Sequence, residues 1–348
     1  MESDKKIKFA VIGCGHIGKR HASMIIGNEN CKLVALCDTK PKAELGIESY
    51  SDVTFFSSID ELLSSNLELD VISVATPNGF HEEHSLKALE RNCHVVIEKP
   101  MALTKAGCEK VIFKALHKHK QVFCVMQNRY SPPSEWLKGI LDQGILGKIY
   151  MVQINCYWNR DDRYYKPDSR TGKPTTWHGT KVLDGGTLFT QFSHFIDLMY
   201  WYFGDIINIS SRLNDFSHQA TTDFEDSGFI SFDFIDGGMG SLNYSTAIWD
   251  KNLESSITVI AENGSLKVGG QYMNEVEYCH IKNYVMPELK ASNPPNDYGL
   301  YKGSAANHHY IYENIVDVLT REGNITTNAL EGLKVVDIIE RIYNLKVN

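Results

Sequence analysis

A glycine-rich turn stands between the first apolar run of the chain and the first stretch with helical periodicity. It comprises Gly13, Cys14, Gly15, His16, Ile17 and Gly18. Glycines at this spacing permit a tight turn, let the backbone approach a diphosphate and let the helix pack close to the strand, while the helix N terminus presents N–H groups to phosphates. The turn therefore constrains the start of the chain to a strand–turn–helix unit that can bind a dinucleotide.

The alternation of apolar runs with helical stretches continues to about residue 126. Apolar runs lie at 7–12, 32–37, 71–75, 94–97 and 122–126, and helices are expected near 17–28, 41–49, 59–65, 80–92 and 104–119. This order is typical of a parallel sheet with helices on both faces. We therefore expect an α/β protein in which residues 1–126 form a doubly wound, dinucleotide-binding domain.

An acidic residue accompanies the glycine turn. Asp38 lies 20 residues beyond Gly18, at the end of the second predicted strand. A carboxylate there can accept hydrogen bonds from a ribose, and it favours NAD over NADP, although Lys40 and Lys42 nearby leave NADP open. The alternative to the whole site is a glycine turn in an α/β protein of another kind.

Polar residues also follow the next strands of the predicted sheet. Ala75-Thr76-Pro77-Asn78 ends one strand and Glu98-Lys99-Pro100 ends the next. Ligands of open α/β sheets bind beyond the carboxyl ends of the strands, so both segments are candidates for cofactor contact. The Lys99 ammonium could stabilise the alkoxide that develops as a hydride leaves. The alternative is a surface lysine paired with Glu98.

After Met126 the pattern changes to that of a second domain, residues 127–348. A helix near 134–143, a strand at 148–158, a polar loop at 159–185 and a helix at 186–203 come first. Strands then follow at 206–213, 228–234, 239–246, 255–261, 264–268 and 275–282, with a loop at 283–303 and helices at 304–321 and 330–345. We expect an α+β domain with a largely antiparallel open sheet.

The predicted helix 186–203 carries polar residues on one face. Thr187, Thr190, Gln191, His194 and Asp197 have the spacing of a single helical face. His194 is a candidate general base, since imidazole titrates near neutrality and can remove a hydroxyl proton. The alternative is a core histidine with satisfied hydrogen bonds.

The composition is that of an ordinary globular protein. Of 348 residues, 43% are hydrophobic, and 35 Lys and Arg against 43 Asp and Glu give a net charge of -8, which argues against a nucleic-acid partner. No apolar run approaches the roughly 18 residues that span a membrane, and the first residues lack a secretion signal, so we expect a cytoplasmic protein. The eight cysteines form no Cys-x-x-Cys pair, and we expect buried thiols and no metal.

The motifs together resemble those of one family. Gly13-x-Gly15-x-x-Gly18, Ala75-Thr76-Pro77-Asn78 followed by His81, and above all Glu98-Lys99-Pro100 are similar to the glucose–fructose oxidoreductase / inositol dehydrogenase (Gfo/Idh/MocA) family of NAD(P)-dependent sugar dehydrogenases. The resemblance covers the whole chain. It implies an N-terminal Rossmann domain, a C-terminal substrate domain and a cis peptide bond between Lys99 and Pro100.

The resemblance also implies roles for single residues. It implies NAD as the cofactor and Lys99 and His194 as the catalytic residues. Cofactor contacts are implied for Gly13, Gly15, His16, Ile17, Gly18, Asp38, Thr76, Pro77, Asn78, His81, Glu98, Lys99 and Gln127. Family members often carry Asp four residues before this histidine, where Thr190 stands here. Without that carboxylate, Lys99 and His194 would share the work.

Within the family, the chain is most similar to the dehydrogenases that oxidise the 3′-hydroxyl of UDP-N-acetyl-glucosaminuronate in lipopolysaccharide sugar biosynthesis. The matching stretches include Tyr157-Trp158-x-Arg160, Asp184-Gly185-Gly186 and Gln191-x-Ser193-His194. The substrate contacts implied are Lys99, Arg160, Arg163, Trp177, Thr190, Gln191 and His194. Asn307, His308 and Tyr310, at the start of the penultimate helix, are expected to border the same pocket.

Two other functions stay open. The same site could serve a redox-neutral glycosidase that holds NAD tightly, or the chain could be a non-catalytic sensor of NAD or a nucleotide sugar. We also expect a homodimer or homotetramer formed through the C-terminal sheet, because Tyr150, Val152 and Ile154 suggest an apolar face that helices leave open.

Overall fold

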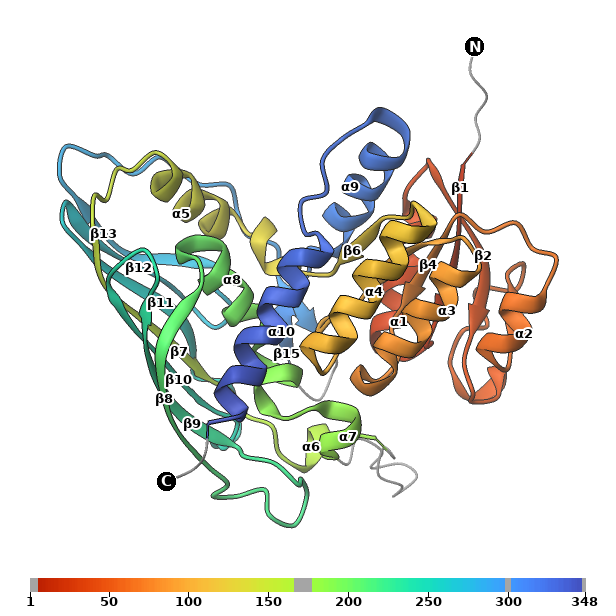
Figure 1. The fold of residues 1–348 in the computed structure, drawn as a ribbon, viewed down its shortest axis with the longest axis horizontal. Coiled ribbons are helices and arrows are strands. Elements are labelled where there is room, and N and C mark those ends of the chain that lie inside the picture. Colours follow the sequence, from red (N-terminus) through yellow and green to blue (C-terminus); the bar gives the residue numbers. More distant parts are fainter. Residues whose placement is uncertain (1–5, 166–176, 298–301, 346–348) are drawn as a thin grey trace. The chain divides into compact units, whose positions relative to one another are not determined.

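The computed structural model describes residues 6–165, 177–297 and 302–345. The chain divides into two compact units, whose elements are labelled in Figure 1. The first unit comprises Met1–Met126 and His308–Val336, and the second comprises Gln127–Asn307 and Asp337–Asn348. The division after Met126 coincides with the predicted domain boundary. The segment 308–336, which we expected in the second domain, belongs to the first unit.

Tyr312 shows why this segment belongs there. Its ring is fully buried and packs edge-on against Phe9, with ring centroids 5.5 Å apart. Its hydroxyl lies 3.0 Å from the hydroxyl of Ser73. Periodicity shows that one face of a helix is buried but not which sheet buries it, so the sequence could not reveal this packing.

The first unit contains a six-stranded parallel sheet in the order β3-β2-β1-β4-β5-β6. The strands are β1 (Ile7–Ile12), β2 (Cys31–Cys37), β3 (Thr54–Phe56), β4 (Val71–Val74), β5 (His94–Ile97) and β6 (Val122–Cys124). All four residues of β4 are buried, as expected for a strand of a parallel sheet covered on both faces. The strand order is that of the Rossmann fold, which confirms the predicted fold of this region.

The helices of the first unit connect these strands. They are α1 (His16–Gly27), η1 (Lys42–Glu44), α2 (Ile59–Ser64), η2 (Asn78–Phe80), α3 (His81–Glu90), α4 (Lys105–Lys118), α9 (His308–Arg321) and the first part of α10 (Ala329–Tyr343). The prediction of a helix at 41–49 was wrong: only the short turn η1 forms after Pro41, and Gly46 has a φ of +62° that ends helical geometry. The edge strand β3 was not predicted, because three partly exposed residues give no apolar run.

The second unit contains a seven-stranded sheet in the order β13-β12-β11-β7-β10-β9-β8. The strands are β7 (Ile149–Tyr157), β8 (Ile206–Asn214), β9 (Ser227–Phe234), β10 (Met239–Ser245), β11 (Glu254–Ala261), β12 (Gly264–Gly269) and β13 (Glu275–Ile281). Only the pair of β7 and β10 is parallel. The predicted largely antiparallel sheet is therefore confirmed.

Helices α5 and α8 lie on one face of this sheet (Figure 1). The other elements of the second unit are η3 (Gln127–Tyr130), α5 (Pro132–Asp142), α6 (Asp162–Tyr165), α7 (Lys181–Asp184), η4 (Leu188–Phe192), α8 (Ser193–Phe203), β14 (Pro295–Asp297) and β15 (Lys302–Ala305). The turns α6 and α7 lie in the stretch expected to be loop, of which residues 166–176 are outside the described part of the chain. No helix among the described residues is long and apolar enough to cross a bilayer.

Successive residues of β7 lie on opposite faces of the sheet. Trp158, which continues the face of Val152 and Ile154, packs edge-on against Phe195 of α8, so those two buried residues face the helices. The alternate residues of β7 include Gln153 and Asn155, which lie on the opposite face. Val152 and Ile154 therefore lie on the covered face, whereas the opposite face carries the exposed side chains of Phe229 and Ile260, and oligomerisation remains a prediction.

The helix expected at 186–203 is not uniform. Its first part, η4, is a π-helix, in which hydrogen bonds close over five residues, and α-helical geometry begins only at Ser193. The π-helical turn shifts the residues before it relative to those after it. The uniform α-helical spacing on which the predicted shared face of Thr187 and Asp197 was based is therefore interrupted, and both residues are buried.

Candidate functional site

The glycine turn has the geometry that a diphosphate requires. Gly13 has a φ of +88°, and a Cβ atom there would lie 2.5 Å from the Ala75 carbonyl oxygen. A Cβ atom on Gly18 would lie 1.7 Å from the Gly13 oxygen, whereas one on Gly15 would meet nothing within 4 Å. Packing thus requires two of the glycines, and the third leaves open space before α1, whose N terminus no side chain caps.

Asp38 is tied to this turn. One carboxylate oxygen accepts the Cys14 N–H at 2.7 Å and the other accepts the Lys40 N–H at 2.9 Å. These bonds fix the carboxylate, and each oxygen keeps a further lone pair for a ribose hydroxyl. His16 is exposed and Ile17 is half-buried beside the turn. The residues of the turn therefore fit a dinucleotide.

His81 joins the ends of two strands. It is fully buried, one ring nitrogen lies 2.7 Å from the Thr76 carbonyl oxygen, and the other lies 2.7 Å from the Pro100 carbonyl oxygen. Burial lowers the pKa of this imidazole, although the two carbonyl contacts oppose the shift. Both ring nitrogens contact backbone carbonyl oxygens, so His81 positions the ends of these two strands, and its predicted cofactor contact stays a prediction. The segment it holds includes Pro77, which is half-buried, and Asn78.

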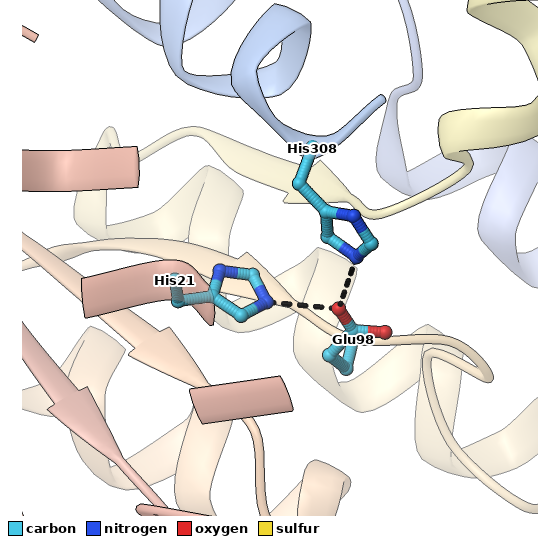
Figure 2. Close-up of side chains that lie close together, drawn as sticks. All are labelled: His21, Glu98 and His308. Carbon is cyan, nitrogen blue, oxygen red and sulfur yellow. Dashed lines mark hydrogen bonds and ion pairs between the residues drawn. The ribbon is translucent and has the colours of Figure 1, made fainter. Parts of the chain in front are cut away.

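Lys99 is half-buried at the end of β5, and its peptide bond to Pro100 is cis, as the resemblance implied. The neighbouring Glu98 is only 7% exposed. Its carboxylate faces two buried imidazoles, those of His21 on α1 and His308 on α9, rather than solvent (Figure 2). His21 could not be identified from local patterns, because nothing in its spacing relates it to Glu98.

In the second unit, His194 is 3% exposed on α8 and contacts Gln127. The Gln127 side-chain nitrogen lies 3.3 Å from Nε2 of His194. Which of these two atoms donates depends on the tautomer of His194, and a neutral imidazole in either tautomer has one nitrogen that can accept a proton. The structure places the Gln127 side chain beside the candidate base, and its predicted contact with the cofactor stays a prediction.

A buried ion pair fixes this arrangement. The Arg129 guanidinium donates through Nε to Asp197 at 2.8 Å and through Nη2 at 2.5 Å, and both side chains are 1% exposed. The pair connects η3, which carries Gln127, to α8, which carries His194. Sequence reasoning missed Arg129, since a charged residue in a polar run is usually solvated.

Thr190 contacts a carboxylate that was not in the predicted site. Its hydroxyl donates to the Asp184 carbonyl oxygen at 2.9 Å and lies 3.3 Å from the Asp184 carboxylate. Asp184 is fully buried and accepts the Gly179 N–H at 2.5 Å. The position that is often Asp in the family is thus occupied by Thr190, whose hydroxyl contacts Asp184, six residues earlier in the chain.

The two arginines predicted to bind substrate anions differ. Arg160 is 2% exposed, donates to the Gln191 side-chain oxygen at 2.6 Å, and lies over the Trp158 ring. Arg163 is more exposed and forms a forked ion pair with Asp161, at 2.7–3.0 Å. Arg160 and Gln191 therefore form a buried polar pair, whereas Arg163 is engaged at the surface.

The remaining predicted residues fall in both units. The Trp177 ring lies against the neighbouring His178 ring in a tilted arrangement, with ring centroids 3.6 Å apart. Asn307 donates to the Gln127 carbonyl oxygen at 3.2 Å, so it supports the segment behind His194. His308 belongs to the first unit with Glu98, and Tyr310 is half-buried on α9. The structure thus brings together Gln127, His194 and Asn307 in one group, and Arg160 with Gln191 in another.

Comparison with known proteins identifies relatives of both units. Residues 7–126 match the NAD-binding Rossmann fold of the GFO_IDH_MocA oxidoreductase family, and residues 135–267 match the GFO/IDH/MocA C-terminal domain. A curated relative, the D-glucoside 3-dehydrogenase of Escherichia coli K12, is 27% identical over 70% of this chain and 71% of its own.

Two solved structures are similar over nearly the whole chain. The WlbA dehydrogenase from Bordetella pertussis, in complex with NADH and UDP-GlcNAcA, is 29% identical, with a TM-score of 0.83 over 97% of this chain and 95% of its own. The WlbA dehydrogenase from Chromobacterium violaceum, with the same ligands, is 28% identical, with a TM-score of 0.84 over 98% of this chain and 94% of its own.

Proposed function

This chain belongs to the Gfo/Idh/MocA family of oxidoreductases, and on that premise we propose that it oxidises the 3′-hydroxyl of UDP-N-acetyl-glucosaminuronate (UDP-GlcNAcA) or a closely related nucleotide sugar. That it is an NAD-dependent sugar oxidoreductase follows from the two family matches and from sugar dehydrogenases among its relatives. The observation that carries the finer proposal is the similarity to two UDP-GlcNAcA complexes along almost the entire chain.

The cofactor contacts come from the first unit. The open position at Gly15 and the N terminus of α1 suit the diphosphate, and the carboxylate of Asp38 suits a ribose. His16, Ile17, Thr76, Pro77 and Asn78 complete the proposed contacts. When bound, NAD supplies the hydride acceptor, and the protein contributes position and electrostatics.

Two side chains act on the hydroxyl that is oxidised. The imidazole of His194, which lies beside the Gln127 side chain, accepts the hydroxyl proton. The Lys99 ammonium stabilises the negative charge that develops on the oxygen. The carbon-bound hydrogen leaves with its electron pair, so the alcohol becomes a ketone while one proton remains on the protein.

Substrate anions require cations that are held in place. The Arg160 guanidinium is oriented by Gln191 and by the Trp158 ring, which suits a forked contact with a carboxylate or diphosphate. Thr190, Gln191 and Trp177 complete the proposed contacts. Arg163 remains in this proposal only if the substrate displaces Asp161 from its guanidinium.

The direct test measures NADH formation with UDP-GlcNAcA, with UDP-GlcNAc as the matched control that lacks the carboxylate. We expect turnover with the uronate and at least tenfold lower kcat/KM with the control. Equal rates with both sugars would contradict a carboxylate-specific site. Sugar release from an aryl glycoside without net NADH would instead identify the redox-neutral glycosidase, and binding without turnover would identify a sensor.

A further inference from the structure

Two buried imidazoles from distant parts of the sequence meet at Glu98. One of its carboxylate oxygens, Oε1, lies 2.8 Å from Nε2 of His21 and 3.4 Å from Nε2 of His308 (Figure 2). The His21 and His308 side chains are 1% and 2% exposed. A carboxylate buried in this way is stable only when its charge is compensated, and here His21 lies at hydrogen-bond distance and His308 at ion-pair distance.

The network extends to the centre of the sheet. Nδ1 of His21 lies 2.5 Å from the Tyr312 hydroxyl, which in turn lies 3.0 Å from the Ser73 hydroxyl on β4. The His21 ring therefore has partners on both nitrogens, and its orientation is fixed. This chain of contacts connects α1, α9 and β4 to the single carboxylate at the end of β5.

The second oxygen of Glu98 connects the network to the lysine. Oε2 accepts the backbone N–H of Lys99 at 3.2 Å. On the other side of Lys99, the Pro100 carbonyl oxygen lies 2.7 Å from His81. Buried imidazoles thus hold the residue before Lys99 and the residue after it.

The same three residues could in principle hold a metal ion, since two imidazoles and a carboxylate are zinc ligands. Zinc bonds of about 2.0–2.1 Å in a tetrahedron place donor atoms roughly 3.3 Å apart. The spacing of 2.8 Å between His21 and Glu98 is that of a hydrogen bond instead. The geometry therefore favours a hydrogen-bonded cluster.

We propose that His21 and His308 are positioning residues of Lys99, acting through the Glu98 carboxylate. The inference rests on the proposed catalytic role of Lys99. Fixed by two imidazoles, the carboxylate holds the Lys99 backbone, and the ammonium keeps one place relative to the sugar hydroxyl. Loss of either imidazole releases the Glu98 carboxylate, and Lys99 then loses its orientation. The glycine turn at residues 13–18 consists of other residues and is unchanged.

The test compares His21→Leu and His308→Leu with the rescuing variants His21→Gln and His308→Gln, whose amides can still donate to Glu98. Misplacement of a reacting group by about 1 Å can cost roughly 100-fold in rate. We expect kcat to fall by roughly that factor in the leucine variants, the KM for the sugar to change less than about threefold, and the glutamine variants to recover most of kcat. His94→Leu, on the same strand, is the control and should leave kcat unchanged.

A second readout needs no substrate. Hydrogen exchange of the Lys99 amide, followed by mass spectrometry of the peptide around it, should accelerate about tenfold in the leucine variants and not in His94→Leu, because a hydrogen bond to a buried acceptor is lost. If the wild-type protein oxidised none of the tested sugars, the proposed function would fail, and the exchange rate would still decide the role of the cluster. Tyr312→Phe, which removes only the hydroxyl beside His21, is the milder variant should the leucine variants not fold.

Two results would overturn the proposal. One is unchanged kcat and unchanged Lys99 exchange in folded His308→Leu and His21→Leu. The other is a stoichiometric metal ion in the purified wild-type protein whose removal by a chelator abolishes activity, because the cluster would then be a metal site.

Discussion

Two glutamates, one in each unit, lie near the segments that carry the two candidate catalytic residues, and they differ in what surrounds them. Glu98, beside Lys99, faces two imidazoles. Glu225 accepts hydrogen bonds from the hydroxyls of Tyr343, at 2.6 Å, and Tyr244, at 2.8 Å. Tyr343 also accepts the N–H of Leu188, at the start of the helical segment that carries His194.

The surroundings shift the pKa values of the two carboxyl groups in opposite directions. Burial disfavours the ionised form of Glu98, but the hydrogen bonds from His21 and His308 outweigh it and hold the pKa of this carboxyl well below its ordinary value. Burial raises the pKa of Glu225 to about 7, because phenols donate hydrogen bonds but carry no positive charge to compensate the carboxylate. An imidazole can carry that charge. Burial alone therefore does not decide the charge of a carboxyl.

The largest effects are expected at the residues that the two glutamates support. Lys99→Ala and His194→Asn should each lower kcat by roughly 100- to 10,000-fold, the range for loss of a proton-transfer or charge-stabilising group. NADH affinity, measured by fluorescence titration, should change little in both. Near-normal turnover in either variant would remove that residue from the mechanism.

The next effect concerns the stability that Glu98 provides. At pH 7, Glu98→Gln should lower the free energy of unfolding by about 3 kcal/mol, because the imidazoles lose their charged partner. The folded pKa is below the unfolded value, so this contribution is complete above about pH 4.3 and is lost as the pH falls through the folded pKa. Urea unfolding of wild type and variant from pH 7 to pH 3 should therefore show curves that converge in acid. Parallel curves would contradict an ionised Glu98.

Glu225 should show the opposite dependence. Its folded pKa is raised, so folding favours the protonated form, and stability is lost as the pH rises from about 4.3 to about 7. A displacement of this size corresponds to about 3 kcal/mol. Glu225→Gln, which stays neutral, should lack this loss, so its stability relative to wild type should increase between pH 5 and pH 8. An unchanged difference would show that Glu225 is ionised throughout.

The smallest effect is expected from the phenols. Tyr343→Phe removes contacts to Glu225 and to the Leu188 N–H, whereas Tyr244→Phe removes only the contact to Glu225. At about 1 kcal/mol for each hydrogen bond, Tyr343→Phe should destabilise the protein more than Tyr244→Phe does in thermal unfolding. The reverse order would argue against support of η4 by Tyr343.

The sequence could predict residues whose role depends on local spacing, but not residues whose role depends on a partner far along the chain. The glycine turn, Asp38 and Lys99 lie at the ends of strands, where local spacing reports the chemistry, and the Rossmann fold followed from the same pattern. His21 and Arg129 have their roles through residues far along the chain, Glu98 and Asp197, and no local pattern encodes such partners. The π-helical turn before His194 could not be predicted either, because an argument from residue spacing assumes uniform α-helical geometry.

The central claim is that hydride leaves the sugar carbon that bears the oxidised hydroxyl. The direct measurement uses UDP-GlcNAcA carrying deuterium at C3′ and follows the label by mass spectrometry of the cofactor after reaction with NAD. The account predicts one deuterium in each NADH formed. The Lys99→Ala and His194→Asn variants should form little NADH, labelled or unlabelled. NADH without deuterium, or deuterium retained at C3′ in every product, would contradict oxidation at this position.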